Sequence, residues 1–485
     1  MHHKLSNKQK IARLVAIYTG MTLLIVSIVT VILLFVLGFR FDTNNGQLEQ
    51  FAFLKFNSVP SGATVTIDGK VVDSQTPNKA SVPEGQYEVV MWRDGYESWR
   101  KTVDVKAGTL NWINYVMLVP KKLSVESIAN YDSIYKSLAS PNNHYIVVEK
   151  NASTPTFDLV DASTDTVKSS QFTIPKTVYS ESNYLGVVHT FDIDQWDEGG
   201  RYILVKHTYN ENSEWLVVDT QDANTTKNIT KLFNLNLTSL NFSGTSGNIL
   251  YCIDANNIRK IDISAGTISR SLASNVISYN LYSSNIITYI GTNENNQKVV
   301  GLYRDGDDNP SVLRTADDVG QSLFVNTTHY FNEDYVSIID GNKVDILSGN
   351  YQNSIINDVS NLKIIKSFEI SENIANVTFS PAGQYLFIQS GSNFTSYDLE
   401  YQTLVSSTID NTGAVSPLKW LNDSYTWSDN SSSLTIREFD GSNAHTINSV
   451  LTGQDVMLTN NGRYLYSFNK LDSGYQLQRV RMILP

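Results

Sequence analysis

One short phrase recurs along this chain at intervals too wide for a single helix or hairpin. In each copy a Ser, Asp or Thr precedes a turn of Asn and Gly, and a Tyr then opens an apolar run. Four copies are clear: SPNNHYIV (140–147), DEGGRYIL (197–204), SPAGQYLF (380–387) and TNNGRYLY (459–466). Weaker copies between them are centred on Ile249, Ile286, Tyr335 and Tyr425. The chain therefore repeats one structural unit.

The spacing of the copies indicates the kind of unit. Eight positions from Tyr145 to Tyr464 lie about 46 residues apart on average, and repeats of 40–50 residues with several short strands are typical of β-propeller blades. The rest of a unit agrees, because segments such as FDLVDASTDTV (157–167) read as a strand ending in an acidic turn. We predict a propeller over residues 122–485 with eight blades, or seven if the weak unit near 277–300 is an insertion. The phrase should mark the turn into a blade's inner strand.

Composition favours an all-β protein. Tyr is abundant (26 of 485 residues), and Asn and Gly supply turns, which together favour strands joined by tight reversals. The single cysteine, Cys252 in ILYCID, excludes an intramolecular disulfide. Because its neighbours are apolar, we expect it to be a buried strand residue.

An uncharged, apolar run over residues 14–38 predicts a transmembrane helix. About 24 helical residues span roughly 36 Å, against a hydrocarbon core of about 30 Å. A cleaved signal peptide has a shorter apolar region and a small-residue cleavage site, so it fits less well. Four basic residues precede the run, and only Arg40 follows it closely. The positive-inside rule then places residues 1–13 in the cytoplasm and, after a linker over 39–50, the remaining domains outside.

Charge also narrows the range of partners. The chain carries −11 in total, and residues 1–40 carry five basic and no acidic residues, so the remainder carries −16. An acidic body repels phosphate backbones, which argues against nucleic acid as a partner. The sequence does not predict an oligomeric state.

Residues 51–121 are predicted to form a small antiparallel β-sandwich. Alternating stretches with the period of strands occur at 53–56, 64–69, 87–92, 101–105 and 112–118, and Gly, Pro, Asn and Asp separate them. Three of the seven tryptophans, Trp92, Trp99 and Trp112, fall here. We expect them to fill the core rather than to form a platform for sugar rings.

The same region resembles the PEGA domain. The resemblance rests on SVPSGATVTIDG, then TP, then VPEGQYEVVMWRDGYESW, then TVDVKAG, in that order. The turn that names the family is Pro83-Glu84-Gly85-Gln86 here, with Gln in place of the final Ala, while Gly85 and Gly95 keep their places. The resemblance implies an extracytoplasmic module of a bacterial envelope or surface protein, and it brings no catalytic residues.

The repeated phrase also resembles the repeats of TolB-like and WD-repeat-like propellers. The match is clearest at 380–387, and no Trp-Asp dipeptide closes the blades, although Trp196-Asp197 occurs elsewhere. Related propellers cap peptidases of the prolyl oligopeptidase type. Here no Gly-x-Ser-x-Gly elbow and no α/β domain is present to supply that chemistry.

Other catalytic signals are weak. Ser133-Ile-Tyr-Lys136 formally matches Ser-x-x-Lys but has no accompanying motif, and one Cys with scattered His predicts no zinc site. The segment Asp305-Gly306-Asp307-Asp308-Asn309 resembles half of a calcium loop, but Ala316 stands where the required Glu should be, so a hairpin tip is favoured. The acids at 192, 194 and 197 could serve glycoside hydrolysis if they converge across a cleft.

The sequence therefore predicts a single-pass membrane protein whose extracytoplasmic propeller binds envelope polysaccharide or a surface protein. It assigns no catalytic, cofactor or metal residue. The alternative is an extracytoplasmic glycan or peptide hydrolase that uses propeller carboxylates. Convergent acids in the central funnel would favour the enzyme, and a funnel lined by Tyr, Asn and Ser would favour binding.

Overall fold

A computed structural model describes residues 7–41, 48–181, 186–283, 285–318, 320–351, 361–370, 374–409 and 415–485. The predicted tail (1–13) and linker (39–50) lie partly outside these residues. Two compact units are present. The first is Met1–Lys122 with Ile483–Pro485, and the second is Leu123–Met482.

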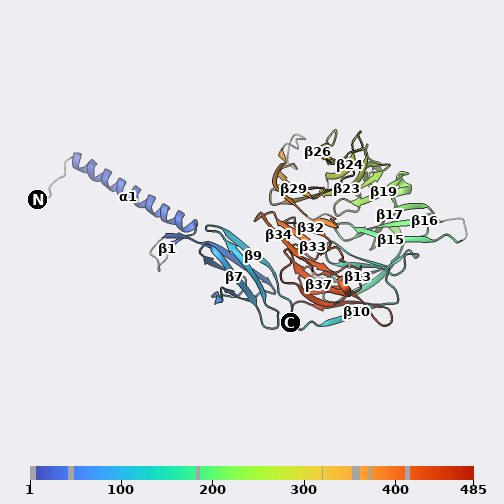
Figure 1. Ribbon diagram of the computed structural model, residues 1–485, viewed down its shortest axis with the longest axis horizontal. Coiled ribbons are helices and arrows are strands. Elements are labelled where there is room, and N and C mark those ends of the chain that lie inside the picture. The colour runs from blue at the N-terminus through green and yellow to red at the C-terminus, as the bar shows by residue number, and fades with distance from the viewer. Residues whose placement is uncertain are drawn as a thin grey trace. The chain divides into compact units, whose positions relative to one another are not determined.

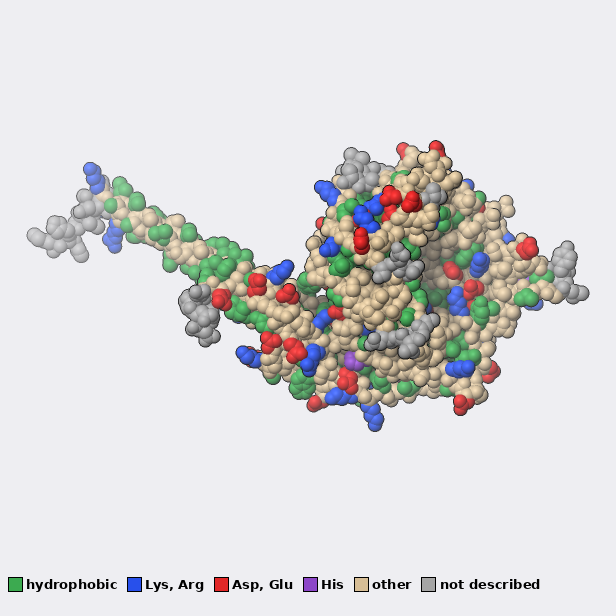
Figure 2. Space-filling model, viewed as in Figure 1, with side chains coloured by type: hydrophobic (Ala, Val, Ile, Leu, Met, Phe, Trp, Pro, Cys, Tyr) green, Lys and Arg blue, Asp and Glu red, His purple; other side chains and the backbone are tan. Residues whose placement is uncertain are grey.

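The first unit begins with one long apolar helix, α1 (Asn7–Val36). Its stretch Lys10–Val36 is long and apolar enough to cross a membrane. Figure 2 shows hydrophobic side chains along its length and basic side chains at its start. The hydroxyls of Thr22 and Thr30 donate to the carbonyls of Tyr18 and Val26, four residues earlier, at 2.9 and 2.8 Å. Such bonds satisfy hydroxyl donors where no water is available, which suits a helix surrounded by lipid.

The rest of the first unit is a two-sheet sandwich (Figure 1). A short pair, β1 (Phe39–Phe41) and β2 (Leu48–Gln50), follows the helix. One sheet has the order β6-β3-β9 and the other β5-β4-β7-β8. The strands are β3 (Ala52–Val59), β4 (Thr64–Ile67), β5 (Lys70–Val71), β6 (Asn78–Val82), β7 (Gly85–Trp92), β8 (Trp99–Val105) and β9 (Leu110–Met117). All five predicted strands are therefore present, and the sequence reading missed β5 and β6.

Two expectations for this sandwich are wrong in part. The pair β3–β9 is parallel, because these strands open and close the domain and the chain between them supplies the crossover. Trp99 is buried in the core as expected, but Trp92 and Trp112 are 42% and 36% exposed. Trp112 lies on the outer face of β9, where the Lys55 ammonium sits 4.1 Å from its ring centroid. From the end of the chain, Leu484 packs against the same core and its N–H donates to Tyr96 Oη.

The second unit is a β-propeller, and its described residues form eight four-stranded sheets. In Figure 1 the chain passes round this unit from teal through green and yellow to red. Seven sheets are built from consecutive strands. These strands are β11 (Lys136–Ala139), β12 (Tyr145–Glu149), β13 (Thr156–Asp161), β14 (Lys168–Thr173), β15 (His189–Trp196), β16 (Tyr202–Tyr209), β17 (Asn212–Asp219), β18 (Lys227–Asn228), β19 (Leu237–Phe242), β20 (Ile249–Asp254), β21 (Asn257–Asp262), β22 (Thr267–Ile268), β23 (Val276–Ser283), β24 (Ile286–Thr292), β25 (Lys298–Arg304), β26 (Ser311–Thr315), β27 (Leu323–Tyr330), β28 (Glu333–Asp340), β29 (Lys343–Gly349), β30 (Lys363–Glu369), β31 (Asn376–Phe379), β32 (Tyr385–Ser390), β33 (Asn393–Asp398), β34 (Thr403–Thr408), β35 (Lys419–Trp420), β36 (Tyr425–Ser428), β37 (Ser433–Glu438) and β38 (His445–Ser449). A short helix, α2 (Ile229–Phe233), follows β18.

The remaining sheet joins the two ends of the propeller. Its order is β10 (Val125–Tyr131), β41 (Tyr475–Arg481), β40 (Tyr464–Lys470) and β39 (Met457–Leu458). The first strand of the unit therefore pairs with the last, in antiparallel register. This closure leaves neither end of the unit as an unpaired strand. The number of blades predicted from the repeats stays a prediction.

The repeated phrase forms the same turn each time. At 380–385, the Ser380 N–H donates to the Tyr385 carbonyl at 2.8 Å, the Tyr385 N–H donates to Ser380 Oγ at 3.2 Å, and Gly383 has φ +84°. Asn143, Gly200 and Gly462 likewise have positive φ. The first residue of the phrase closes the turn, and the fourth supplies the left-handed backbone that favours Gly or Asn.

The position of this turn within its sheet differs from the prediction. Each copy leads into the strand that pairs with the innermost strand of its sheet, for example β32 beside β31 or β40 beside β39. The strand before the turn is the innermost, because residues of β15, β19, β23 and β27 line the central cavity. The phrase therefore stands at the end of the innermost strand, close to the mouth of the channel.

Replacing Gly383 by Ala should destabilise the propeller by about 2 kcal/mol more than Gly391→Ala. Both glycines have positive φ, so the backbone penalty is shared. A Cβ at Gly383 would lie 2.2 Å from Thr328 Oγ1 and 2.8 Å from the His329 carbonyl, whereas at Gly391 nothing lies within 4 Å. Thermal unfolding of the two variants measures the difference, and equal losses would contradict the close approach of neighbouring sheets.

Candidate functional site

Amide side chains join neighbouring innermost strands of the propeller. Asn280 Nδ2 donates to the Val325 carbonyl at 2.6 Å, Asn326 Nδ2 to the Val377 carbonyl at 3.1 Å, and Asn376 Nδ2 to the Leu418 carbonyl at 3.0 Å. Each innermost strand is the edge of its sheet and presents unpaired backbone groups to the channel. The asparagines satisfy some of these groups and fix the spacing of successive sheets.

A cavity of about 380 Å³ lies where these strands meet. Its described lining is mostly amide, hydroxyl and aromatic, with one carboxylate, that of Glu198. The lining residues are Pro141, Gln195, Trp196, Glu198, Asn241, Phe242, Tyr279, Asn280, Leu281, Asn326 and Thr327. They come from the middle and the ends of innermost strands and from the turns that follow, so the cavity opens toward the repeated phrases.

Several lining groups are held in place by other parts of the protein. The Trp196 indole N–H donates to the Leu138 carbonyl at 3.1 Å, and Tyr279 Oη donates to the Tyr251 carbonyl at 2.7 Å. Gln195 Oε1 accepts from the Phe242 N–H at 3.1 Å. These bonds orient the side chains before any ligand arrives, which lowers the entropic cost of binding.

The side-chain amide oxygens of Asn280 and Asn326 are available to a ligand. An amide whose nitrogen donates to a neighbouring carbonyl still carries its oxygen as an acceptor. In the part of the chain that the structure describes, no hydrogen bond reaches Oδ1 of Asn280 or Asn326, and both side chains are at least partly exposed. The cavity can therefore accept hydrogen bonds from hydroxyl or amide groups of a ligand.

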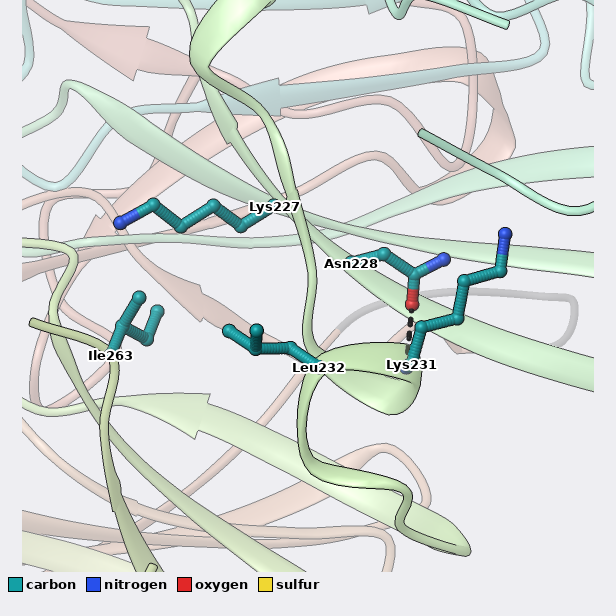
Figure 3. A pocket seen from close by; sticks show the side chains of 5 residues that line it. All are labelled: Lys227, Asn228, Lys231, Leu232 and Ile263. Atoms are coloured by element: carbon teal, nitrogen blue, oxygen red, sulfur yellow. Dashed lines mark hydrogen bonds between the residues drawn. The ribbon is translucent and has the colours of Figure 1, made fainter. Parts of the chain in front are cut away.

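A second hollow, of about 510 Å³, lies beside α2 (Figure 3). Leu232 and Ile263 face each other across it, Lys227 extends beside them, and Lys231 points away. Asn228 accepts from the Lys231 N–H at 3.0 Å and caps the short helix, so its amide oxygen has a structural role. The described lining of this hollow offers aliphatic contacts and the ammonium group of Lys227. It has fewer polar groups than the channel cavity.

Most of the acids at 192–197 are engaged by other groups of the fold. Asp192 pairs with Lys136 at 2.8 Å, and Asp197 Oδ1 accepts from the Arg201 and Tyr202 N–H groups in the turn. Asp194 is exposed to solvent, yet the protein atoms that surround it desolvate its carboxyl and raise its pKa above the ordinary value. Two of the three carboxylates are thus occupied in holding the fold.

The acidic segment 305–309 is also built into the structure. Asp305 pairs with Lys260, and buried Asp307 accepts from the Arg304 guanidinium at 3.2 Å. Backbone carbonyls of Asp307 and Asp308 accept from the Arg270 guanidinium. No group of three or more His, Cys, Asp or Glu able to hold a metal occurs within the described residues.

The remaining sequence candidates are structural as well. Ser133 Oγ donates to the Lys150 carbonyl while Lys136 pairs with Asp192, so the two do not form a catalytic pair. Cys252 is fully buried, as expected, and burial raises its pKa to about 12. A thiol so protonated is a poor nucleophile.

Sequence reasoning missed two buried polar clusters. In one, His207 Nδ1 lies 2.8 Å from Glu214 Oε1 and His207 Nε2 lies 2.9 Å from His189 Nδ1. Burial alone would raise the pKa of Glu214, but hydrogen bonds from His207, Asn228 and Ser180 lower it to about 2. These residues come from several strands, and only the sheet register brings them together.

The other cluster centres on Glu149 of β12, whose side chain is fully buried. Its Oε2 accepts from the Ile193 N–H at 3.3 Å, and Oε1 has no hydrogen bond from the described residues. Burial raises its pKa to about 7, with the backbone bond and Lys136 opposing and Asp192 adding to the rise. No local signal in the sequence YIVVEK distinguishes this acid from an exposed one.

The geometry of the small sandwich agrees with a comparison to known families. Residues 51–119 match the PEGA domain. The resemblance seen in the sequence is therefore confirmed for this part of the chain. Among proteins of curated function, none matches the chain in sequence. The match identifies the sandwich of the first unit and says nothing about the function of the propeller.

Solved structures similar to this chain include several propeller proteins. Dipeptidyl peptidase 4 from Porphyromonas gingivalis matches at 12% identity and a TM-score of 0.47, covering 70% of this chain and 57% of its own. A structure from a study of two prolyl endopeptidases matches at 12% identity and a TM-score of 0.45, covering 73% and 55%. The β-propeller domain of Swd1 from Myceliophteria thermophila matches at 11% identity and a TM-score of 0.37, covering 74% and 99%. The chain thus spans little more than half of each peptidase.

Proposed function

We propose that this protein is a single-pass, membrane-anchored binding protein whose propeller recognises a neutral envelope polysaccharide outside the cytoplasm. The observation that carries the proposal is the channel cavity, whose described lining offers fixed amide oxygens, oriented aromatic rings and one carboxylate. Hydroxyl groups of sugars are the donors that such acceptors suit, and aromatic faces suit the apolar faces of sugar rings.

The charge of the body supports a neutral ligand. Residues 41–485 carry −16, and the described lining of the cavity includes the exposed carboxylate of Glu198. An anionic polymer would be repelled by this field, whereas an uncharged one would not. We therefore favour a neutral polysaccharide over an acidic one and over nucleic acid.

Helix α1 supports the membrane anchor. It is apolar over Lys10–Val36, and two of its threonine hydroxyls are bonded within the helix. The basic residues Lys8, Lys10 and Arg13 lie before the uncharged run that begins at residue 14 and favour a cytoplasmic N-terminus. Alkaline extraction of membranes and protease protection of intact cells test this part: release by alkali, or a protected propeller, would reject it.

A binding role is favoured over hydrolysis because the cavity lacks paired acids among its described lining residues. Glycoside hydrolysis needs two carboxyl groups across the scissile bond, about 5–10 Å apart. Of the three acids predicted from the sequence, none lines the described cavity, and Asp192 and Asp197 are held by Lys136 and by backbone N–H groups. A lone Glu198 at the mouth provides one half of the required pair.

The test is a calorimetric titration of the full chain in detergent with neutral oligosaccharides. Asn326→Leu removes one acceptor oxygen from the cavity and should weaken binding about tenfold, since a lost hydrogen bond in a pocket costs about 1–2 kcal/mol. Asn393→Leu, on the exposed start of β33, is the matched control and should bind as the wild type does. Equal affinity of all three proteins would reject the cavity as the binding site.

A further inference from the structure

Phe331 stands out among the exposed residues of the propeller. Its side chain is 73% exposed, and it occupies the loop between β27 and β28. Because Tyr330 pairs with Glu333, this loop consists of only two residues, Phe331 and Asn332. An aromatic ring at the tip of a tight hairpin gains no stability from burial.

The backbone at this position favours a different residue. Phe331 has φ +55°, and it is the one aromatic residue with a left-handed backbone in the described part of the chain. In two-residue hairpin loops a positive φ at the first position is the place where glycine is normally found. The local backbone conformation therefore does not account for a phenylalanine here, and this outlier directs attention to a role in contact with another molecule.

The neighbouring side chains hold the ring in place. Tyr330 Oη donates to Glu400 Oε2 at 2.7 Å, which fixes the tyrosine. The Phe331 ring then packs edge-to-face on that tyrosine, with centroids 4.6 Å apart. On the same turn, His329 Nδ1 lies 2.9 Å from Asp334 Oδ1. The exposed ring thus stands on an ordered base, so little conformational entropy is lost when a ligand stacks on it.

The hairpin is continuous with the channel cavity. Asn326 and Thr327, which line the cavity, belong to β27, and Phe331 follows this innermost strand at its end. Phe331 lies four positions after Thr327, a rise of about 13 Å along an extended strand. A ligand that fills the cavity and extends along β27 would reach the ring after leaving the mouth.

We propose that Phe331 forms an outer subsite of the channel, where its ring stacks on a sugar residue of the same neutral polysaccharide chain. This inference rests on the proposed function and adds to it a requirement for ligand length. Oligosaccharides that fit within the cavity do not reach Phe331, and longer ones do. An aromatic contact of this kind suits the apolar face of a pyranose and does not require a charged group on the sugar.

The experiment titrates the full chain in detergent with neutral oligosaccharides of increasing length. Phe331→Gly should bind short oligosaccharides as tightly as the wild type does and long ones about tenfold more weakly. Phe331→Tyr, which keeps the ring, should restore the wild-type affinity. Val188→Gly removes a side chain that is 68% exposed immediately before β15 and should change neither affinity.

The outcomes separate this subsite from the proposed function. If short and long oligosaccharides bind the wild type and Phe331→Gly equally, the subsite is rejected while the cavity remains. If Phe331→Gly weakens binding at every length, a separate outer subsite is also rejected. If no neutral oligosaccharide binds the wild type, both proposals fail.

The Tm of Phe331→Gly should not fall, because glycine suits the positive φ. An unchanged Tm shows that a loss of binding does not come from unfolding.

Discussion

Replacing Leu477 by Ala should lower the free energy of unfolding of the propeller by about 3 kcal/mol and its Tm by about 4 °C. Leu477 lies on β41, is fully buried, and packs with Tyr131, Ile146 and Phe468. It lies opposite Ala129 of β10 and Phe468 of β40, at the point where the first and last strands of the unit meet. The cavity left by three missing carbon atoms therefore weakens the contact that closes the ring.

The neighbouring residue of the same strand provides the control. Gln476 also pairs across to β10, but its side chain is only half-buried and its amide donates to Asn130 Oδ1 at 3.1 Å. Gln476→Ala should cost less than about 1 kcal/mol. Thermal unfolding followed by tryptophan fluorescence compares the two variants. A loss for Leu477→Ala no greater than for Gln476→Ala would contradict the pairing of β10 with β41.

Replacing Glu149 by Gln should raise the Tm at pH 8 by about 4 °C and leave it nearly unchanged at pH 4.5. The pKa of Glu149 is raised from its ordinary value of 4.5 to about 7, chiefly by burial. Below pH 4.5 the group is protonated in both the folded and the unfolded chain. Between pH 4.5 and 7 the unfolded chain loses its proton first, so stability falls as pH rises. Above pH 7 the free energy of unfolding is about 3 kcal/mol lower than at pH 4.5, because one pKa unit corresponds to about 1.4 kcal/mol.

Gln reproduces the shape of the neutral acid and cannot ionise, so the variant avoids this loss. Glu211→Gln, on the exposed turn between β16 and β17, is the matched control and should have no such pH dependence. Melting curves of the three proteins at several pH values between 4.5 and 8 make the comparison. A wild-type Tm that does not fall over this range, or a Gln variant that falls in parallel with it, would contradict a buried Glu149 that is neutral in the fold.

The sequence predicted the fold where the determinants are local. Tyr145, Tyr385 and Tyr464 open the strand next to the innermost one because the preceding turn is fixed by residues within five positions of them. The strands of the PEGA domain followed in the same way from alternation and turn residues. The segment NKASV, which forms β6, was missed because its residues are small and polar; it becomes a strand by pairing with β3.

The candidate site could not be predicted in the same way, because its geometry depends on contacts between sheets. Asn280 and Val325 are joined by a hydrogen bond across 45 positions, and no local pattern marks either residue. Glu149 and Asp192 likewise meet only through the packing of β12 against β15. The register of the sheets selects which of the chain's many asparagines line the cavity.

The most direct test of a binding function combines retention with analysis of the ligand. The full chain, immobilised in detergent, is incubated with neutral envelope polysaccharide fragments, and the masses of the retained and released fragments are measured. The account predicts that fragments are retained by the wild type, retained less by Asn326→Leu, and recovered at their original mass. Shortened fragments would show a hydrolase, and the absence of retention would point to a protein partner; either result would contradict the account.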